Sequence, residues 1–557
     1  MAPSDRAHPP ELELGPLEER VSRRLERWDR DDLGARLWDG DPTVWFAQPM
    51  PELTDRLGWL TLPDDMAHAP EELHRFAADV SAGGVRHIVL LGMGGSSLAP
   101  EVFAATLETT PGAPRLLMLD TTHPTAVRAA IERVDPSRAL FVVSSKSGTT
   151  IETLSLFRAC WSMVARAAAQ PGRQFVAITD PGTPLETLAN ERGFLRVYQA
   201  PFDVGGRYSA LSVFGLVPAA LAGANTRRVI ERAQEMARAS GPDVPAVANP
   251  ALRLGAALGE LFLAGRDKLT FCASPGLATV PAWIEQLVAE STGKDGKGLV
   301  PIVDEPRFPS EHYGDDRAFV FLTLARDGEP DPTFRESLAR AGHPVINLRF
   351  ADPADLGREM FRWELATAVT GAVLGIHPFD QPDVQVAKDL ARKAMQGDGG
   401  PGADDEALRV AAPDAVAAAV GSWARAARPR DYVALQAYLA PNNETSEALQ
   451  RLRRILGDRL RIATTVGYGP RFLHSTGQLH KGGPDTGLFL QLVDEPSMDL
   501  PIPETDATFG RLIGAQALGD FAALRQRGRR ALRVTLGEDT AAGLAQLADI
   551  LDGTVTG

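Results

Sequence analysis

Short apolar runs alternate with helix-like segments from residue 85 onward, and this alternation constrains the fold more than any other feature of the chain. Most of these runs end in Gly, Asp or Ser. Strand–helix alternation at this spacing predicts an α/β fold with a doubly wound parallel sheet. In the first half, strands are expected at 85–92, 114–120, 139–145, 174–180 and 194–201, and helices at 97–109, 123–134, 150–169 and 183–192.

The same rhythm returns after a mostly helical stretch at 209–265. Further strands are expected at 267–274, 318–324, 343–350, 431–439, 459–470, 487–495 and 531–537, with a helix near 508–528. A Gly/Asp-rich stretch at 395–407 is typical of a linker. We therefore predict four parts: a helical N-terminal arm (1–80), a first sheet domain (81–225), a helical connector (226–265) and a second sheet domain (266–557). The linker lies within the second sheet domain.

Two turns rich in glycine and hydroxyl groups follow strands of the first predicted sheet, at 92–97 and 144–150. In open parallel sheets, ligands bind beyond the carboxyl ends of the strands. Glycines let an anion approach the backbone, and hydroxyls beside a helix N-terminus donate to it. The first turn alone also fits a plain strand-to-helix connection, and it lacks the spacing of a dinucleotide fingerprint or a P-loop. The density of donors in the second turn is harder to explain by packing. Together the two turns predict a phosphate cradle.

The charge and composition of the chain exclude several classes of partner. The net charge of −14 disfavours binding to nucleic acid or to an anionic membrane surface. We expect no membrane span, because no run of about 20 apolar residues occurs, and no secretory signal, because the N-terminus is polar. Two cysteines, Cys160 and Cys272, in so long a chain suit a reducing cytoplasm.

Five segments carry a resemblance to a known family. "SSKSGTTIET" (144–153) resembles the phosphosugar-binding signature of the sugar isomerase (SIS) domain, and "GMGGSSLAP" (92–100) resembles the companion loop of the glucose-6-phosphate isomerase family. The other three segments follow in the order of that family: "DVGGRYSALSVFGL" (203–216), "ESTGKDGKG" (290–298) and "FDQPDVQVAK" (379–388).

The resemblance implies two SIS-type domains, no metal or other cofactor, and a reaction class. The reaction would be the reversible isomerisation of D-glucose 6-phosphate and D-fructose 6-phosphate in glycolysis and gluconeogenesis. The implied substrate- and phosphate-binding residues are Gly95, Ser96, Ser145, Lys146, Ser147, Thr150, Gly206 and Gln381. The implied catalytic residues are Glu290, Arg207, Lys388 and His474.

These residue types suit an aldose–ketose isomerisation. Opening the sugar ring needs an acid–base group that titrates near neutrality, which histidine supplies. Moving a proton between C2 and C1 needs a carboxylate, here Glu290. The developing oxyanion needs a fixed positive charge, here Arg207. Lys294 and Lys297 are interpreted as solvent-facing charges.

The histidine segment departs from the usual order of the family. "GPRFLHSTGQLHKGG" (469–483) resembles the segment of the ring-opening histidine, yet it follows Lys388 instead of preceding it. This order resembles the isomerase half of actinobacterial-type transaldolase–isomerase fusions. No transaldolase barrel is expected before the first predicted strand. Such a barrel needs about 250 residues, and that strand begins at residue 85. His474 is therefore the ring-opening candidate, and His377 is interpreted as structural.

Several alternatives remain open at this point. A homodimer is expected by resemblance, and His474 could act within its own chain or from the neighbouring subunit. A dual phosphoglucose/phosphomannose isomerase is a rival, since epimer preference depends on a few atoms around C2. A glucosamine-6-phosphate synthase would need an N-terminal cysteine nucleophile, which Met1-Ala2-Pro3 does not supply. A non-catalytic sugar-phosphate sensor would not need Arg207, Glu290 and Lys388 together.

Overall fold

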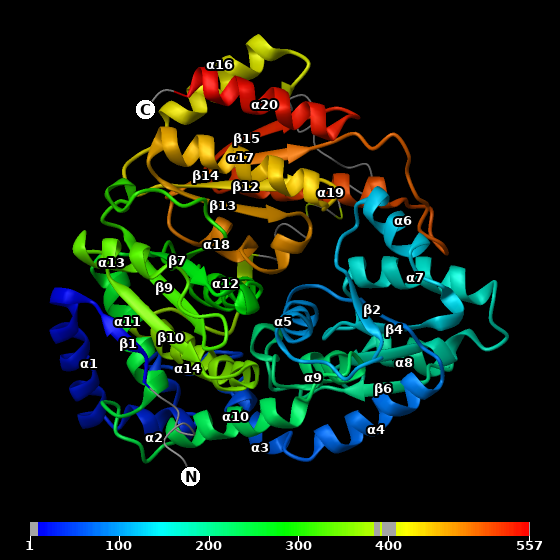
Figure 1. Cartoon of the computed structure of the whole chain (residues 1–557), viewed down its shortest axis with the longest axis horizontal. Coiled ribbons are helices and arrows are strands. Elements are labelled where there is room, and N and C mark those ends of the chain that lie inside the picture. Colours follow the sequence, from blue (N-terminus) through cyan, green and yellow to red (C-terminus); the bar gives the residue numbers. More distant parts are fainter. Residues whose placement is uncertain (1–8, 384–389, 391, 393–407, 556–557) are drawn as a thin grey trace.

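The fold consists of three five-stranded sheets placed around a common centre (Figure 1). The structure is a computed structural model that describes residues 9–383, 390, 392 and 408–555. Three helices face the centre, one from each sheet region: α5 (Leu98–Thr106), α12 (Val280–Thr292) and α18 (Gly477–Gly482). Helices connect the parallel strands of each sheet, which confirms the predicted α/β class.

The first sheet is entirely parallel, in the order β3-β2-β4-β5-β6. From β2 the chain moves outward to β3 and then returns to β4 on the other side of β2. The turns after β2 and β4 therefore leave the sheet in opposite directions and open a crevice between them. The strands are β2 (His87–Leu91), β3 (Arg115–Leu119), β4 (Ala139–Ser144), β5 (Phe175–Thr179) and β6 (Arg196–Gln199); the other helices are α6 (Pro124–Glu132), α7 (Ile151–Ala165), α8 (Pro184–Glu191) and α9 (Val213–Leu221).

The second sheet has the order β1-β10-β9-β7-β8, and β1, from the N-terminal arm, pairs antiparallel with β10. Its strands are β1 (Glu11–Glu13), β7 (Lys268–Ala273), β8 (Val300–Ile302), β9 (Arg317–Leu324) and β10 (Val345–Phe350). Besides α12, its helices are α13 (Pro332–Arg340) and α14 (Leu356–Leu374). The arm also contains α1 (Glu18–Arg30), α2 (Leu33–Trp38), α3 (Leu62–Asp65) and α4 (Ala69–Ala82), and the connector contains α10 (Thr226–Ala239) and α11 (Pro250–Leu263).

The third sheet is parallel, in the order β11-β15-β14-β12-β13, and has its own apolar core. Its strands are β11 (Leu408–Arg409), β12 (Tyr432–Tyr438), β13 (Ala463–Tyr468), β14 (Gly487–Val493) and β15 (Arg530–Thr535). Besides α18, its helices are α16 (Pro413–Arg425), α17 (Asn443–Leu460), α19 (Phe509–Gln526) and α20 (Thr540–Thr554).

The sequence analysis expects one sheet within 266–557, whereas the described residues of this range form two. The strand–helix rhythm is the same in both sheets, so the rhythm gives no sign of where one sheet ends. The predicted linker at 395–407 lies outside the described residues, and the predicted domain boundaries stay predictions.

The third sheet region is fixed against the other two by buried polar and apolar contacts. Arg453, fully buried on α17, donates to the carbonyl oxygens of Asp304 (2.7 Å) and Val303 (3.0 Å) of the second sheet region. Phe509 and Leu512 of α19 join the apolar cluster on one face of the first sheet. The relative placement of the three regions is thus set by specific packing.

Two further features of the chain are the state of its two cysteines and the apolar character of its helices. Cys160 and Cys272 are both buried, and burial raises the pKa of each thiol to about 12. Neither is therefore a reactive thiolate near neutral pH. Among the described residues, no helix has both the length and the apolar character needed to cross a bilayer.

Candidate active site

The two predicted turns lie at the crevice of the first sheet. The first is a single 3₁₀ turn, Gly94–Ser96, followed by α5 with Ser97 as its N-cap. The second leads into α7, whose N-cap is Thr150. Neither N-cap side chain bonds to its own helix. The first backbone N–H groups of both helices can therefore donate to a dianion.

The hydroxyl groups of the second turn pair with one another. Ser145 Oγ lies 2.9 Å from Thr150 Oγ1, and Ser147 Oγ lies 2.9 Å from Thr149 Oγ1. A phosphate would replace these neutral hydrogen bonds with charge-assisted ones, which are roughly twice as strong. The predicted residues Ser145, Ser147 and Thr150 are thus brought together in one turn.

Lys146 is engaged by a carboxylate of its own sheet region. Its Nζ lies 2.6 Å from Asp180 Oδ2. Burial lowers the pKa of the Lys146 ammonium, and burial raises the pKa of the Asp180 carboxyl. A role for Lys146 in holding phosphate therefore requires that Asp180 share or release the ammonium.

The glycines of the first turn are needed because other backbone segments approach them closely. A Cβ on Gly95 would lie 2.0 Å from the carbonyl oxygen of Gly206, and one on Gly94 would lie 2.8 Å from that of His474. Gly94 also has a φ of 54°, which disfavours any side chain. The predicted residues Gly95 and Gly206 thus touch each other, and the turn after β2 packs between the Arg207 and His474 segments.

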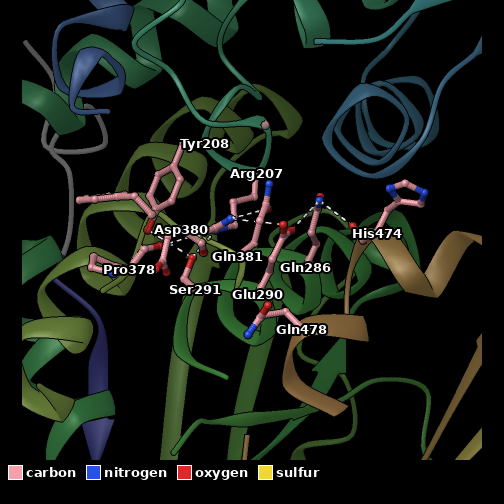
Figure 2. Close-up of polar contacts among 12 residues, drawn as sticks. Arg207, Tyr208, Gln286, Glu290, Ser291, Pro378, Asp380, Gln381, His474 and Gln478 are labelled. Carbon is pink, nitrogen blue, oxygen red and sulfur yellow. Dashed lines mark hydrogen bonds and ion pairs between the residues drawn. The ribbon is translucent and has the colours of Figure 1, made fainter. Parts of the chain in front are cut away.

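Arg207 is buried, and its guanidinium is held on several sides. It donates to Ser291 Oγ (2.7 Å), the carbonyl oxygens of Pro378 (2.7 Å) and Asp380 (3.0 Å), and Gln381 Oε1 (3.1 Å). Its Nη1 also lies 3.3 Å from Glu290 Oε1. A fixed positive charge thus faces the predicted base, and the predicted residue Gln381 is part of the same arrangement (Figure 2).

Gln286 links Glu290 to the His474 segment. It lies one turn before Glu290 on α12, so the two side chains share a face of the helix. Its Nε2 donates to Glu290 Oε2 (3.1 Å) and to the carbonyl oxygen of His474 (2.8 Å). Figure 2 shows these side chains in a row that runs from Arg207 through Glu290 and Gln286 to His474.

The His474 imidazole contacts a carboxylate of the first sheet region. Nε2 of His474 lies 3.0 Å from Glu152 Oε1, and the same oxygen accepts from Gln516 Nε2 at 2.7 Å. A carboxylate can only accept here, so Nε2 carries the proton of this bond. Nδ1 is then the nitrogen left for acid–base exchange with a ligand.

The predicted residue Lys388 lies outside the described residues, but the chain just before it is anchored at the site. Asp383 donates its backbone N–H to Gln478 Oε1 (2.9 Å) and accepts from Gln478 Nε2 (2.7 Å). Gln478 lies on α18, which begins three residues after His474. The segment that leads to Lys388 therefore starts beside the His474 segment.

The interpretation of Lys294 and Lys297 as solvent-facing is wrong. Lys294 is buried and lies 2.7 Å from Asp380 Oδ1, and burial lowers the pKa of its ammonium to about 7. Lys297 donates to the carbonyl oxygen of Leu374 at 2.7 Å. The turn that carries both lysines folds back against the Asp380 segment, which the sequence did not indicate.

The structural interpretation of His377 fits its contacts. Its Nε2 lies 2.9 Å from the carbonyl oxygen of Pro51, and its Nδ1 accepts the backbone N–H groups of Phe379 (3.1 Å) and Asp380 (3.2 Å). Burial lowers the pKa of the ring, which favours the neutral form. Both ring nitrogens therefore serve the shape of the 377–380 turn.

Two residues of the site, Glu152 and Gln286, received no role in the sequence analysis. Glu152 lies inside the segment that resembles the phosphosugar signature, at the second position of α7, where a buried carboxylate needs a partner. Gln286 could have been found from its spacing of four residues to Glu290. The partner of Glu152 has no local signal, because it comes from the third sheet region.

Comparisons with known proteins show which proteins this chain resembles. A family model described as phosphoglucose isomerase matches residues 69–300. A glucose-6-phosphate isomerase of Rubrobacter xylanophilus is 30% identical over 396 residues, which cover 62% of this chain and 90% of that protein. One of Leptospira interrogans is 28% identical over 380 residues, which cover 60% and 85%. Arg207 and Glu290 lie within the range of the family model, and His474 lies beyond it.

Two solved structures resemble this chain in fold. A hypothetical protein of Thermus thermophilus matches with a TM-score of 0.59 and 26% identity, over 69% of this chain and 99% of that one. A glucose-6-phosphate isomerase of Chlamydia trachomatis matches in fold, with a TM-score of 0.51 and 20% identity, over 70% of this chain and 86% of that one. Both leave part of this chain without a counterpart.

Proposed function

Because this chain belongs to the glucose-6-phosphate isomerase family, it interconverts D-glucose 6-phosphate and D-fructose 6-phosphate, and we propose that Glu290, Arg207 and His474 carry out the chemistry. One observation carries this assignment. A single amide, Gln286 Nε2, bonds both the Glu290 carboxylate and the backbone of His474. The Arg207 guanidinium lies on the other side of the carboxylate, 3.3 Å away.

Ring opening is assigned to His474. Glu152 accepts from Nε2, which fixes the tautomer and leaves Nδ1 to take the proton of the sugar O1 hydroxyl and to return one to the ring oxygen. Glu152 also stabilises the imidazolium that forms between the two transfers. This pairing of an imidazole with a buried carboxylate supports the acid–base role.

Proton transfer is assigned to Glu290. In the open-chain aldose, its carboxylate removes the proton from C2, and the electrons of that C–H bond form the enediolate. A proton moves from the C2 hydroxyl to the C1 oxygen, and the same carboxyl returns a proton to C1, which gives the ketose. Arg207 stabilises the negative charge that develops on the C1 and C2 oxygens, and its many bonds to the protein hold it ready in place.

The two turns of the first sheet are assigned to the phosphate group. Their hydroxyls and the N-terminal N–H groups of α5 and α7 would supply the donors. This binding acts on substrate and transition state alike, so it concentrates the substrate and fixes its carbon chain over Glu290. Lys388 and Gln381 are proposed to line the ring end of the sugar.

We further propose that His474 acts within its own chain. The support is that Gln286 and Glu152 of the same chain bond to the backbone and the ring of His474. In that case the expected homodimer contributes no His474 side chain to a neighbouring site. A homodimer remains the expected assembly, and sedimentation would test it. A cytoplasmic location is proposed on the low cysteine content.

The test of the base is Glu290→Gln. A glutamine keeps the bond to Gln286 but cannot take a proton, so kcat should fall by about 10³- to 10⁴-fold. The affinity for glucitol 6-phosphate, which cannot isomerise, should stay within about threefold by calorimetry, because its phosphate contacts are intact.

Glu336→Gln is the matched control for this test, since it makes the same change on the exposed face of α13 and should retain full turnover. Retained turnover in Glu290→Gln would reject the assignment of the base. Assays with mannose 6-phosphate on the unchanged chain would decide whether the second epimer is also a substrate.

A further inference from the structure

A second cleft, of about 460 Å³, lies between the second and third sheet regions. Three segments line it: 305–317, which leads into β9, 424–430, which leads into β12, and 459–463, which leads into β13. All three precede strands. The cleft therefore lies at the amino ends of these strands, and none of the described residues assigned above to the active site lines it.

Cations outnumber anions in the lining of this cleft. Six arginines line it, namely Arg317, Arg425, Arg428, Arg430, Arg459 and Arg461. The three carboxylates are Glu305, Asp315 and Asp316. In a chain of net charge −14, such a local surplus of positive charge is a distinct feature of the surface.

Most of the carboxylates in and around the cleft are already paired. Glu305 bonds to Arg317, and both side chains are buried. Asp316 lies 3.3 Å from Lys268, a buried lysine beneath the cleft. Asp315 lies 3.9 Å from Arg430.

Three arginines of the lining remain without a carboxylate. Arg459 is neutralised from outside by Asp552 of α20, at 2.8 Å. Among the described residues, no ion pair involves the side chain of Arg425, Arg428 or Arg461. Arg461 donates to the carbonyl oxygen of Glu311 (3.2 Å), a neutral partner, so an anion that enters the cleft would gain from all three charges.

The backbone at two of the arginines adds an independent observation. Arg430 and Arg461 have positive φ angles, 71° and 53°. Every other described non-glycine residue with a positive φ is Asp or Glu, and aspartate tolerates this conformation through local hydrogen bonds. Arg461 ends α17 as its left-handed C-cap, an ordinary helix end that needs no ligand. Arg430 lies in the turn before β12, and strain of this kind tends to gather at ligand sites. Both arginines line the same cleft.

We propose that this cleft, the arginine cleft, binds a small anion that carries a triphosphate group. A volume of about 460 Å³ suits a small molecule and is too small for a folded partner. Guanidinium groups bind phosphate oxygens in pairs, and arginines on different segments can surround a chain of phosphates. Arg425, Arg428 and Arg461 supply the uncompensated charges.

A ligand in the arginine cleft would bridge two halves of the molecule. Segment 305–317 belongs to the second sheet region, which carries Glu290, and the other two segments belong to the third, which carries His474. Binding would therefore hold together the two regions whose junction positions the ring-opening residue. The expected result is a rise in melting temperature with ligand concentration.

The test is calorimetric titration of the full chain with inorganic tripolyphosphate, in the presence of excess fructose 6-phosphate to fill the active site. One tripolyphosphate should bind per chain. The double variant Arg425→Gln/Arg428→Gln should weaken this binding by about tenfold or more, since each charge-assisted bond contributes about 1.5–3 kcal/mol. Its isomerase activity should be unchanged, which also reports that it folds.

The matched control is Arg133→Gln/Arg454→Gln, which removes the same charge from exposed arginines outside the cleft and should bind tripolyphosphate as before. Equal weakening in both double variants, or no binding beside fructose 6-phosphate, would overturn the proposal. ATP is the second probe and distinguishes a nucleotide from a free polyphosphate. Tighter binding of ATP than of tripolyphosphate indicates a nucleotide ligand, and weaker binding of ATP indicates a free polyphosphate. Binding of ATP without any binding of tripolyphosphate would overturn the proposal, because the base and not the triphosphate group would then be recognised.

Discussion

The first and third sheets share one plan but contribute to the active site in different ways. Each is parallel, and in each the chain reverses its direction of strand addition near the middle, at β2 and β4 in one and at β12 and β14 in the other. The first sheet puts its two binding turns at that reversal. The third instead contributes His474 from the turn after β13, its edge strand.

This difference separates local from long-range control of the site. The hydroxyl groups of the second phosphate turn pair with neighbours in the same turn, so their geometry depends on one sheet. His474 is held by residues of other regions, and Arg471 of the same 3₁₀ turn contacts Asp120 (3.0 Å) and Glu101 of the first sheet region. We therefore expect changes in the first sheet to affect KM and changes in the third to affect kcat.

The largest effect is expected for His474→Ala. Without an acid–base group at the ring oxygen, kcat with glucose 6-phosphate should fall by about 10²- to 10³-fold, with KM nearly unchanged. Turnover of erythrose 4-phosphate, which cannot close a ring, should fall much less. His68→Ala, at an exposed histidine of the N-terminal arm, is the control. Equal losses with both substrates would assign ring opening elsewhere.

Mixing inactive variants shows whether His474 serves its own chain. Glu290→Gln and His474→Ala chains, unfolded and refolded together, should remain inactive if a single chain supplies both residues of each site. Recovery of activity toward about a quarter of the wild-type value would mean that the histidine crosses between subunits of a dimer. That result would show that the third sheet region contributes His474 to the site of the partner subunit and not to the site of its own chain.

A smaller effect is expected for Ser145→Ala/Thr150→Val in the first sheet. Loss of two hydroxyl donors to phosphate should raise KM by about tenfold or more and leave kcat within about twofold. Steady-state kinetics would measure both constants. Turnover of glucose without a phosphate is the control, since it should not respond. A fall in kcat with unchanged KM would show that these hydroxyls do not act in ground-state binding.

The smallest effect is expected for Arg471→Gln. Arg471 is a positioning residue, because it acts through the placement of the His474 turn. Its loss should lower kcat by about three- to tenfold with KM unchanged, and Arg471→Lys should restore part of kcat through the contact with Asp120. A change in KM alone would place the influence of Arg471 at the phosphate turns.

The sequence predicts those parts of the site that local motifs encode. The turns of the first sheet, Arg207 and Glu290 lie where the segments "SSKSGTTIET", "GMGGSSLAP", "DVGGRYS" and "ESTGKDGKG" indicate. The role of each residue remains a prediction that the experiments above test.

The sequence does not predict the contacts between distant regions. The bond between Glu152 and His474 joins two sheet regions, and no motif near either residue indicates the other. The burial of Lys294 depends on Asp380, which a separate segment supplies. The third sheet is not predicted for a related reason. Strand pairing depends on which long segments pack together, and the repeated order of strands and helices does not determine that.

The antiparallel strand β1 has a consequence for the solubility of the molecule. Without it, β10 would present a row of free backbone groups to which another chain could add a strand. β1 pairs with the Val345–Asn347 part of that row and is only three residues long, and two of the three are glutamates. The border of the second sheet is thereby short and negatively charged, which discourages strand addition between molecules at high protein concentration.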